Sequence, residues 1–256
     1  MIDFIVSANS DIGNTRKTNQ DSVSVLVADT SIGPVAFAVI CDGMGGLAKG
    51  EMASASVLHA FTNWFKKDFP QDLSIGISDS LIKEQWNKII LDQNEKIQNY
   101  GRSEGINLGT TVSVILITQE RYFITNVGDT RIYEISNCVR QITEDQTVVA
   151  QELKYGRITH NQAANDPRQS VLLQCVGASK TVIPDFFFGT TIQHATYMLC
   201  SDGFRHLISD DEIYSYFNCQ ILRDQNVMNK NSLELININK QRMEKDNITV
   251  ALIKTY

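Results

Sequence analysis

Several of the most apolar segments of this sequence begin or end at an acidic residue. The segment VAFAVIC is followed by Asp42 and a glycine, and the segment YMLCS is followed by Asp202 and a glycine. Three more aspartates adjoin segments of the same kind: Asp21, Asp129 and Asp246. Each of these carboxylates lies at the end of a candidate strand. The five are therefore the first residues to consider for chemistry.

A single Asp-Gly pair usually indicates a turn, because both residues tolerate the left-handed backbone conformation. Five acids at strand ends favour a second interpretation. In antiparallel sheets neighbouring strand ends can lie side by side, where the carboxylates would repel one another unless cations neutralised them. Ligands that are all oxygen, with no His or Cys among them, suit hard ions such as Mg²⁺ or Mn²⁺. The pattern therefore predicts a divalent metal site.

Arg16 lies five residues before Asp21, in the segment RKTNQD. A bend at Asn19 would return its guanidinium group towards the acids, where a planar fork suits bidentate binding of a phosphate. The alternative is a surface arginine paired with an acid, and the sequence leaves both readings open. The glycine-rich segment DGMGG at 42–46 precedes a predicted helix and could cradle phosphate. It is a weak signal, because it matches neither a Walker motif nor GxGxxG.

The composition excludes several other classes of protein. Among 256 residues, 23 Lys and Arg oppose 29 Asp and Glu, and the net charge of −6 disfavours nucleic acid or an anionic membrane as the main partner. Five cysteines without CxxC spacing predict reduced thiols and no zinc site, with Cys41 and Cys200 as buried packing residues. The sequence has neither a signal-peptide pattern nor an apolar run that could span a membrane, so we expect a cytoplasmic protein.

The first half of the chain supplies strands and then helices. Strand patterns occur near 3–8, 22–28 and 34–41, and their close spacing predicts antiparallel pairing, because a parallel connection needs a dozen or more residues. From about residue 46 the apolar residues recur every four positions, which predicts a helix. A second helix is predicted at about 77–99.

The second half returns to strands. Runs at 110–118, 121–127 and 130–136 predict a meander, because only a few turn residues separate them, and the polar, irregular residues 145–180 predict an excursion from the sheet. The remaining predicted elements are strands at FFFGTTI and HATYMLCSDG, helices at 210–217 and about 226–242, and a strand at 247–255. This order predicts an α+β fold, an antiparallel β-sandwich of two sheets packed face to face and flanked by pairs of α-helices.

Six motifs resemble, in the same order over nearly the whole chain, the metal-dependent Ser/Thr protein phosphatases of type 2C, in particular the bacterial members. The motifs are RKTNQD, CDGMGG, GTT (109–111), NVGDTR (126–131), CSDG (200–203) and DNIT (246–249). Each is weak alone, but six in order are specific. The resemblance implies a single catalytic domain over 1–256, with a variable flap at roughly 145–180 beside the active site.

The resemblance also implies roles for the acids. Asp42 would bridge two metal ions at the catalytic centre. The Gly43 carbonyl and a water-linked Asp21 would help to hold one ion, whereas Asp202 and Asp246 would hold the other.

Two more residues would complete the site. Arg16 would bind the substrate phosphate as a catalytic residue, and Asp129 would join Asp202 at a third, weaker metal position. The chain departs from many eukaryotic members at Gln20, where they have Glu, and at Met44, where they have His. A histidine general acid is therefore missing, so protonation of the leaving group would fall to metal-bound water.

The flap departs from the family pattern as well. Where the family often has HP-R-x-N, this chain has Asp166-Pro167-Arg168 followed by Gln169 and Ser170. The change affects expected contacts between the flap and the substrate, not the metal core.

The sequence thus predicts an enzyme that hydrolyses phosphoserine and phosphothreonine esters on proteins with two or three Mn²⁺ or Mg²⁺ ions. Its partners would be phosphorylated substrates of a Ser/Thr kinase, and we expect a monomer without nucleic-acid or membrane partners. Two alternatives stay open. One is another two-metal phosphoesterase, such as a nuclease or small-molecule phosphatase, and a nuclease is disfavoured by the lack of a basic and aromatic stripe. The other is an inactive phospho-binding module on the same fold, which the presence of all the acids disfavours.

Overall fold

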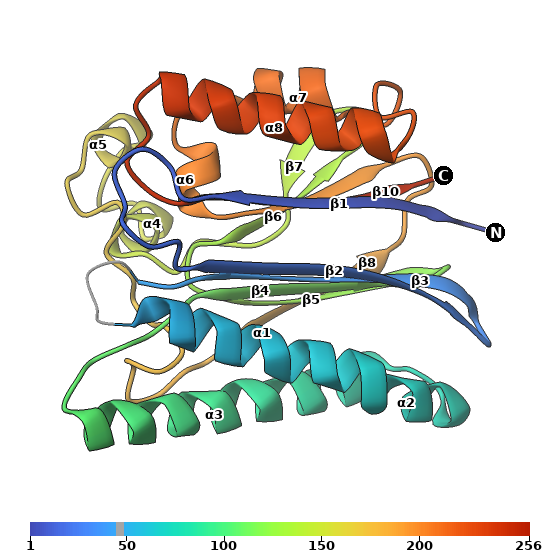
Figure 1. Cartoon of the computed structure of the whole chain (residues 1–256), viewed down its shortest axis with the longest axis horizontal. Helices are drawn as coiled ribbons and strands as arrows, with labels where there is room; N and C mark the ends of the chain where they lie inside the picture. The colour runs from blue at the N-terminus through green and yellow to red at the C-terminus, as the bar shows by residue number, and fades with distance from the viewer. Residues whose placement is uncertain (45–48) are drawn as a thin grey trace.

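The computed structural model describes residues 1–44 and 49–256, and over these residues two antiparallel five-stranded sheets pack face to face (Figure 1). The first sheet has the order β1 (Phe4–Asp11), β10 (Ile248–Thr255), β9 (Thr196–Cys200), β6 (Arg131–Ile135) and β7 (Val139–Gln141). The second has the order β2 (Asp21–Thr30), β3 (Gly33–Asp42), β4 (Val112–Ile117), β5 (Arg121–Val127) and β8 (Asp185–Thr190).

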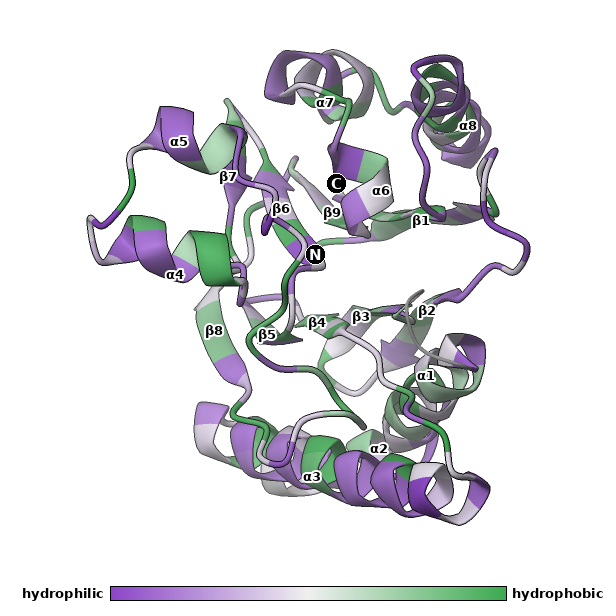
Figure 2. Cartoon of the chain, turned by 90° about the vertical axis from the view of Figure 1, so that its left-hand side faces the viewer, coloured by the Kyte–Doolittle hydropathy of each residue, from purple (hydrophilic) through white to green (hydrophobic). Residues whose placement is uncertain are grey.

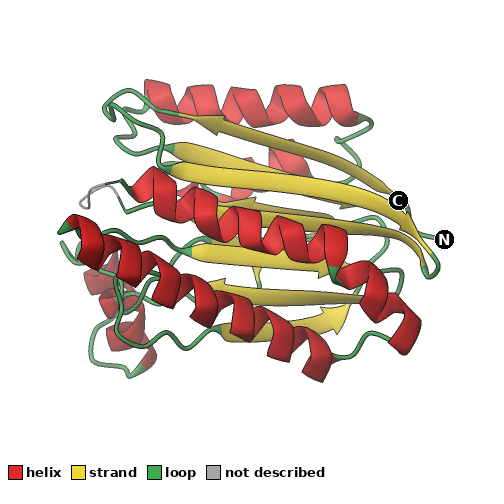
Figure 3. Ribbon diagram, turned by 60° about the horizontal axis from the view of Figure 1, so that its bottom comes forward, coloured by secondary structure: helices red, strands yellow, loops and turns green. Residues whose placement is uncertain are grey.

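Helices cover the outer face of each sheet (Figures 1 and 3). The second sheet carries α1 (Gly50–Lys67), α2 (Phe69–Ile75) and α3 (Asp79–Glu104). The first carries α6 (Asp202–Arg205), α7 (Asp210–Phe217) and α8 (Gln225–Gln241). Two short helices, α4 (Val148–Lys154) and α5 (His160–Ala164), stand at one end of the sandwich (Figure 2). The predicted α+β sandwich with flanking helices is confirmed.

The period of two along β3 explains the layers. Phe37 and Val39 belong to the core that α1 and α3 form against the second sheet, whereas Ala38 and Ile40 belong to the core between the sheets. All four side chains are fully buried. Because successive side chains point to opposite faces, a strand covered on both faces has a continuous apolar sequence. The run VAFAVIC is such a strand.

Local sequence signals predicted two of the helices correctly. The helix predicted at 210–217 begins after Ser209, whose hydroxyl accepts the Glu212 amide hydrogen while the Glu212 carboxylate accepts from the Ser209 amide, so the predicted capping box is present. The helix predicted at about 77–99 is α3, with Ser78 as its N-cap and Gly105 in the left-handed conformation after its last turn. The short elements α2, α6 and β7 were not predicted from the sequence.

The sheet assignment of β1 differs from the simplest expectation. The first strand pairs along its length with β10, the last strand, rather than with β2. Of the first three strands, only β2 and β3 form the antiparallel pair that the close spacing predicts. Residues 12–20 are long enough to carry the chain from one sheet to the other. Short sequence spacing therefore did not identify the partner.

The predicted meander at 110–136 is wrong in the same way. β4 and β5 pair in the second sheet, but β6 lies in the first sheet beside β9. The link between β5 and β6 crosses from sheet to sheet, and a buried polar cluster fixes this crossing. Ser113 donates to the Asn126 side chain at 2.5 Å and shares a 2.7 Å hydroxyl contact with Thr130, while the Asn126 amide donates to the Gly128 carbonyl. Gly128 has a φ of 101°, which favours glycine.

Candidate active site

The two sheets bring the five strand-end acids to one end of the sandwich. Asp21 begins β2 and Asp42 ends β3, and the two residues are direct partners in the antiparallel register. Asp202 begins α6 directly after β9, and Asp246 precedes β10, which runs antiparallel to β9. Asp129 lies in the link from β5 to β6. The second sheet therefore supplies two acids, the first sheet two, and the crossing between them the fifth.

A cavity of about 450 Å³ opens at this end. Four of the predicted acids and the predicted arginine line it: Arg16, Asp42, Asp129, Asp202 and Asp246. The rest of its wall comes from Met44 and Thr111 and from residues 170–179 of the segment predicted as a flap: Ser170, Leu172, Gln174, Cys175 and Ser179. The structure thus places this segment beside the acids.

The remaining two predicted residues lie just behind the cavity wall. Asp21 does not line the cavity, and its carboxylate accepts a 2.5 Å hydrogen bond from the Thr249 hydroxyl. The backbone of Gly43 is pressed between Gln20 and Gly50, and a Cβ atom at this position would come within 2.6 Å of both of their carbonyl oxygens. Only glycine fits there without moving the backbone. Gly45 and Gly46 of the DGMGG motif lie outside the described residues.

The GTT motif holds the backbone of Asp42. The Asp42 amide donates to the Thr111 hydroxyl at 3.0 Å, and the Asp42 carbonyl accepts from the Thr111 amide and from the Thr110 hydroxyl, each at 2.9 Å. The carboxylate of Asp42 is thereby directed from a fixed backbone. The structural role of the GTT motif is therefore to hold the backbone of Asp42 in place.

The acids perturb one another strongly. Burial raises the pKa of the Asp42 carboxyl group well above its usual range, and the neighbouring Asp21 and Asp202 raise it further. Burial raises the pKa of Asp21 to about 7 against the lowering effect of the Thr249 hydrogen bond. Burial and Asp202 raise the pKa of Asp129 to about 7, while Arg205 opposes the shift. Closely placed, desolvated carboxylates of this kind are stabilised by a cation among them.

The donor set fits a hard divalent ion. The Asp202 Oδ1 atom is buried and has no hydrogen-bond partner among the described residues. Within the same residues no three Asp, Glu, His or Cys side chains come together closely enough to form a direct cage of ligands. Mg²⁺ usually keeps several waters and binds proteins through one or two carboxylates. Oxygen donors spread around a cavity of this size therefore match such an ion better than they match zinc.

Arg16 occupies the position expected of it but faces an acid. Its Nε and Nη2 atoms donate to the two carboxylate oxygens of Asp246 at 2.9 and 2.6 Å. The chain bends at Lys17 and Thr18, two residues and one residue before the predicted position at Asn19, and Arg16 lines the cavity. The structure shows the pairing of Arg16 with an acid, and that acid belongs to the cavity. Binding of a phosphate by Arg16 stays a prediction.

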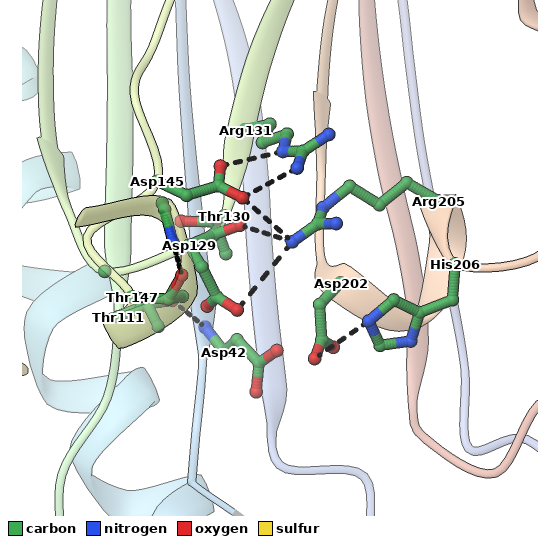
Figure 4. Close-up of polar contacts among 12 residues, drawn as sticks. Asp42, Thr111, Asp129, Thr130, Arg131, Asp145, Thr147, Asp202, Arg205 and His206 are labelled. Atoms are coloured by element: carbon green, nitrogen blue, oxygen red, sulfur yellow. Dashed lines mark hydrogen bonds and ion pairs between the residues drawn. The ribbon is translucent and has the colours of Figure 1, made fainter. Parts of the chain in front are cut away.

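Sequence reasoning missed a second arginine. Arg205 follows Asp202 by three positions in α6, so both side chains lie on one side of the helical turn (Figure 4). Its Nη2 atom donates to the Asp129 carbonyl at 3.3 Å and lies 3.7 Å from the Asp129 carboxylate and 3.5 Å from the Asp145 carboxylate. Asp145 is itself held by Arg131 through bonds of 2.7 and 2.6 Å. The spacing to Asp202 was the only sequence signal for this network.

The network joins Asp129 to the start of the flap segment. Gln146 follows Asp145, and its amide donates to the Gly128 carbonyl at 3.0 Å while its side-chain oxygen accepts from the Gly128 amide at 2.8 Å. His206 stands on the other side of Arg205, 3.6 Å from a carboxylate oxygen of Asp202 (Figure 4). The acids of the cavity are therefore supported by a second set of side chains.

The cysteines near the acids are packing residues, as predicted. Cys41 and Cys200 are fully buried, and burial raises the pKa of both thiols. Cys175 lines the cavity, and burial raises the pKa of its thiol as well. A thiol with a raised pKa stays protonated at neutral pH and is a poor nucleophile.

Known proteins share both the sequence and the fold. A family model described as protein phosphatase 2C matches residues 14–234. The serine/threonine phosphatase stp of Listeria monocytogenes is 29% identical over 248 residues, which cover 96% of this chain and 93% of that protein.

Two solved structures extend this likeness. The serine/threonine phosphatase of S. agalactiae superposes with a TM-score of 0.83 at 27% identity, covering 98% of this chain and 99% of the other. The catalytic domain of the serine/threonine protein phosphatase PstP, solved with two manganese ions, superposes with a TM-score of 0.78 at 26% identity, covering 100% and 99% of the two chains. None of the helices in the described part of this chain is both long and apolar enough to cross a membrane.

Proposed function

The chain belongs to the protein phosphatase 2C family and is a metal-dependent protein serine/threonine phosphatase, and we propose that the acidic cavity is the place where it hydrolyses phosphoserine and phosphothreonine esters. One observation supports this assignment above the others. Arg16 and Asp246, which are 230 positions apart, meet at the same cavity as Asp42, Asp129 and Asp202. All five belong to the residues that strand-end position, spacing and motif order predict from the sequence.

We propose that the acids hold Mg²⁺ or Mn²⁺ in two principal positions. Asp42 would be shared between the ions, with the Gly43 carbonyl and Asp21 supporting one position and Asp202 with Asp246 the other. When bound, such ions lower the pKa of a water molecule and draw negative charge from the phosphate oxygens. Asp21 lies behind the wall, which supports an indirect role for it. Asp129 would contribute with Asp202 to a third position.

Arg16 would orient the substrate. Its guanidinium fork matches two phosphate oxygens as well as it matches the carboxylate of Asp246. Its side chain is 37% exposed, so it can exchange one anion for the other at little cost. A substrate phosphate that entered the cavity would therefore meet a preformed cationic partner.

The proton for the leaving oxygen would come from water. Met44 lines the cavity at the position where a histidine was missing from the sequence pattern, and its thioether cannot donate a proton. Among the described residues that line the cavity there is no His, and every acid there belongs to the proposed ligand set. The chain itself thus supplies orientation and charge, not a general acid.

Several wider properties are part of the same proposal. We propose that residues 1–256 act as a single catalytic domain, that the substrates are proteins phosphorylated by a Ser/Thr kinase, and that the enzyme is a cytoplasmic monomer. All five cysteines are free, which supports a reducing compartment. Size-exclusion chromatography with light scattering tests the oligomeric state directly.

The catalytic assignment is tested with two aspartate variants and a matched control. Asp42→Asn and Asp202→Asn should each lose nearly all hydrolysis of p-nitrophenyl phosphate and of a phosphothreonine peptide in Mn²⁺, and EDTA should stop the wild type. Asp29→Asn is the control, because Asp29 is an exposed residue near the opposite end of β2 from Asp21. Full activity of Asp42→Asn would refute the site. A strong preference for phosphotyrosine would refute the substrate class.

A further inference from the structure

A second cavity adjoins the first and has the opposite charge. It measures about 540 Å³ and is lined by Thr15, Arg16, Lys17, Thr18, Gln20 and Lys245. Three of these six residues are cationic and none is acidic. Arg16 lines both cavities, so the two share one side chain as a common wall. In a protein with a net charge of −6, an acid-free cavity with three cations is an unusual local environment.

A buried asparagine holds the two loops of this cavity together. Asn247 is only 4% exposed. Its side-chain amide donates to the carbonyls of Ile12 at 2.9 Å and Thr18 at 3.3 Å, and its side-chain oxygen accepts from the Gln20 amide at 2.9 Å. The loop 12–20 is therefore fastened at both of its ends to the loop that carries Lys245.

A glycine brings the same loops close together. A Cβ atom on Gly13 would lie 2.4 Å from the Asp246 carbonyl, so the backbone there approaches more closely than any other residue would allow. Together with the Asn247 hydrogen bonds, this contact fixes the backbone of the two loops that carry the three cations. A site whose backbone is already in place loses little freedom when it binds a ligand.

Two of the three cations have no anionic partner among the described residues. Lys17 and Lys245 are exposed, and within the described residues neither ammonium group makes a hydrogen bond or an ion pair. Arg16 is engaged with Asp246 on the side of the first cavity. Like charges gathered around one cavity repel, and an anion between them relieves the repulsion. The chemistry of this cavity is therefore that of an anion site.

We propose that the cavity binds a second acidic group of the phosphoprotein substrate, within about three residues of the phosphoserine or phosphothreonine that is hydrolysed. This inference rests on the proposed function. An extended peptide advances about 3.3 Å per residue, so a group two or three positions away reaches the neighbouring cavity while the phosphate occupies the first. The acidic group is an Asp or Glu carboxylate or a second phosphate on the same peptide.

A set of peptides distinguishes the two sources of negative charge, a carboxylate and a second phosphate. Three phosphothreonine peptides of equal length are compared: one with neutral flanking residues, one with Glu on both sides, and one with a phosphoserine two positions away. The measurement is kcat/KM for release of phosphate from the threonine, in Mn²⁺ at low salt. For wild type we expect the better of the two anionic peptides to exceed the neutral one about tenfold, the scale of two partly screened ion pairs. The preference should shrink as salt is added.

Charge reversal tests whether these lysines cause the preference. In the double variant Lys17→Glu with Lys245→Glu, kcat/KM for the better anionic peptide divided by kcat/KM for the neutral peptide should fall below one. The neutral peptide should still be cleaved. That continued cleavage shows that the variant is folded. Lys66→Glu with Lys67→Glu is the matched control, because it reverses two exposed charges in the last turn of α1, and it should keep the wild-type ratio.

Three results would overturn the proposal: equal kcat/KM for the three peptides with wild type, an anionic preference that survives the Lys17 and Lys245 reversal, or the same loss in the control. Inhibition by inorganic phosphate that the reversal weakens, without any peptide preference, would also overturn it and would make the cavity a site for free phosphate. Failure of the proposed function gives a different result. In that case neither p-nitrophenyl phosphate nor any of the peptides is hydrolysed by wild type in Mn²⁺.

Discussion

Two arginine–aspartate pairs border the acidic cavity, and they differ in burial rather than in chemistry. In the outer pair, Arg16 and Asp246 meet through a bidentate contact of 2.9 and 2.6 Å, and their side chains are 37% and 28% exposed. In the inner pair, Arg205 and Asp129 are 3.7 Å apart, and their side chains are 13% and 7% exposed. The pair with the better contact geometry is the one in contact with water.

The surroundings explain what each pair can do. The inner pair belongs to a network with Asp145 and Arg131 (Figure 4). The outer pair joins two loops, because Arg16 lies before β2 and Asp246 lies before β10. An exposed ion pair contributes about 0–1 kcal/mol, so Arg16 can leave Asp246 for a substrate phosphate. A buried charge that loses its partner is costly, so Arg205 is committed to its acids. Burial, more than distance, separates the arginine that we propose to bind substrate from the one that supports the site.

The largest effect is expected from Arg205→Met. The substitution removes the cation that faces the Asp129 and Asp145 carboxylates, and at pH 9, well above the Asp129 pKa of about 7, it should lower the free energy of unfolding by about 3–5 kcal/mol. Chemical denaturation in EDTA measures this without a contribution from bound ions. Arg205→Lys, which keeps the charge but loses the fork, should recover part of the loss. A change below about 0.5 kcal/mol for Arg205→Met would show that the two pairs are equivalent.

Arg16→Ala should have the opposite pattern to Arg205→Met, with a small effect on stability and a larger effect on ligand binding. The free energy of unfolding should change by less than about 1 kcal/mol, because the outer pair is exposed. Binding of a phosphate ester should weaken by roughly 2–4 kcal/mol, as expected when a charge-assisted contact with the ligand is lost. Calorimetric titration should give a Mn²⁺ affinity near that of wild type. A collapse of metal binding would make Arg16 a structural residue like Arg205.

Asp129→Asn separates the metal role of the inner pair from its structural role. Asn keeps the turn geometry of Asp, so the variant should fold normally and bind two ions. It should lose at least about tenfold in turnover, a barrier change of roughly 1.4 kcal/mol, if Asp129 and Asp202 share a third ion. Excess Mn²⁺ should restore part of the activity by mass action. Wild-type turnover on both a phosphopeptide and a small ester would assign Asp129 to the turn alone.

The smallest effect is expected at an ion pair that does not line the cavity, Arg242 with Glu212. The Arg242 guanidinium and the Ser209 amide lower the pKa of Glu212 to about 2, below its ordinary value of 4.5. A carboxyl group with a lowered folded-state pKa stabilises the protein above its unfolded pKa and loses that contribution as the pH falls towards the folded value. Glu212→Gln should therefore lower the unfolding midpoint slightly at pH 6, and the difference from wild type should shrink between about pH 4.5 and pH 2. An equal difference at pH 6 and at pH 2.5 would contradict this assignment.

The sequence alone determined most of the elements and five of the residues that line the cavity. Apolar runs of period two and four identified the strands and the long helices, and the Ser209 capping box located the start of α7 correctly. Strand-end position, spacing and the order of six short motifs selected Arg16, Asp42, Asp129, Asp202 and Asp246, and all five line one cavity. These signals are local, because side-chain period and capping depend on residues a few positions apart.

Only the tertiary structure decided which strands pair and which groups support the acids. The sequence did not show that β1 joins β10, that β6 leaves the meander for the other sheet, or that Asp145 and Arg205 flank Asp129. Each of these contacts joins residues that are distant in sequence, and each is fixed by burial and by hydrogen bonds that exist only after the sheets have packed. Similar apolar runs can pair in several ways, because the pattern of a strand records which faces are covered and not which neighbour covers them.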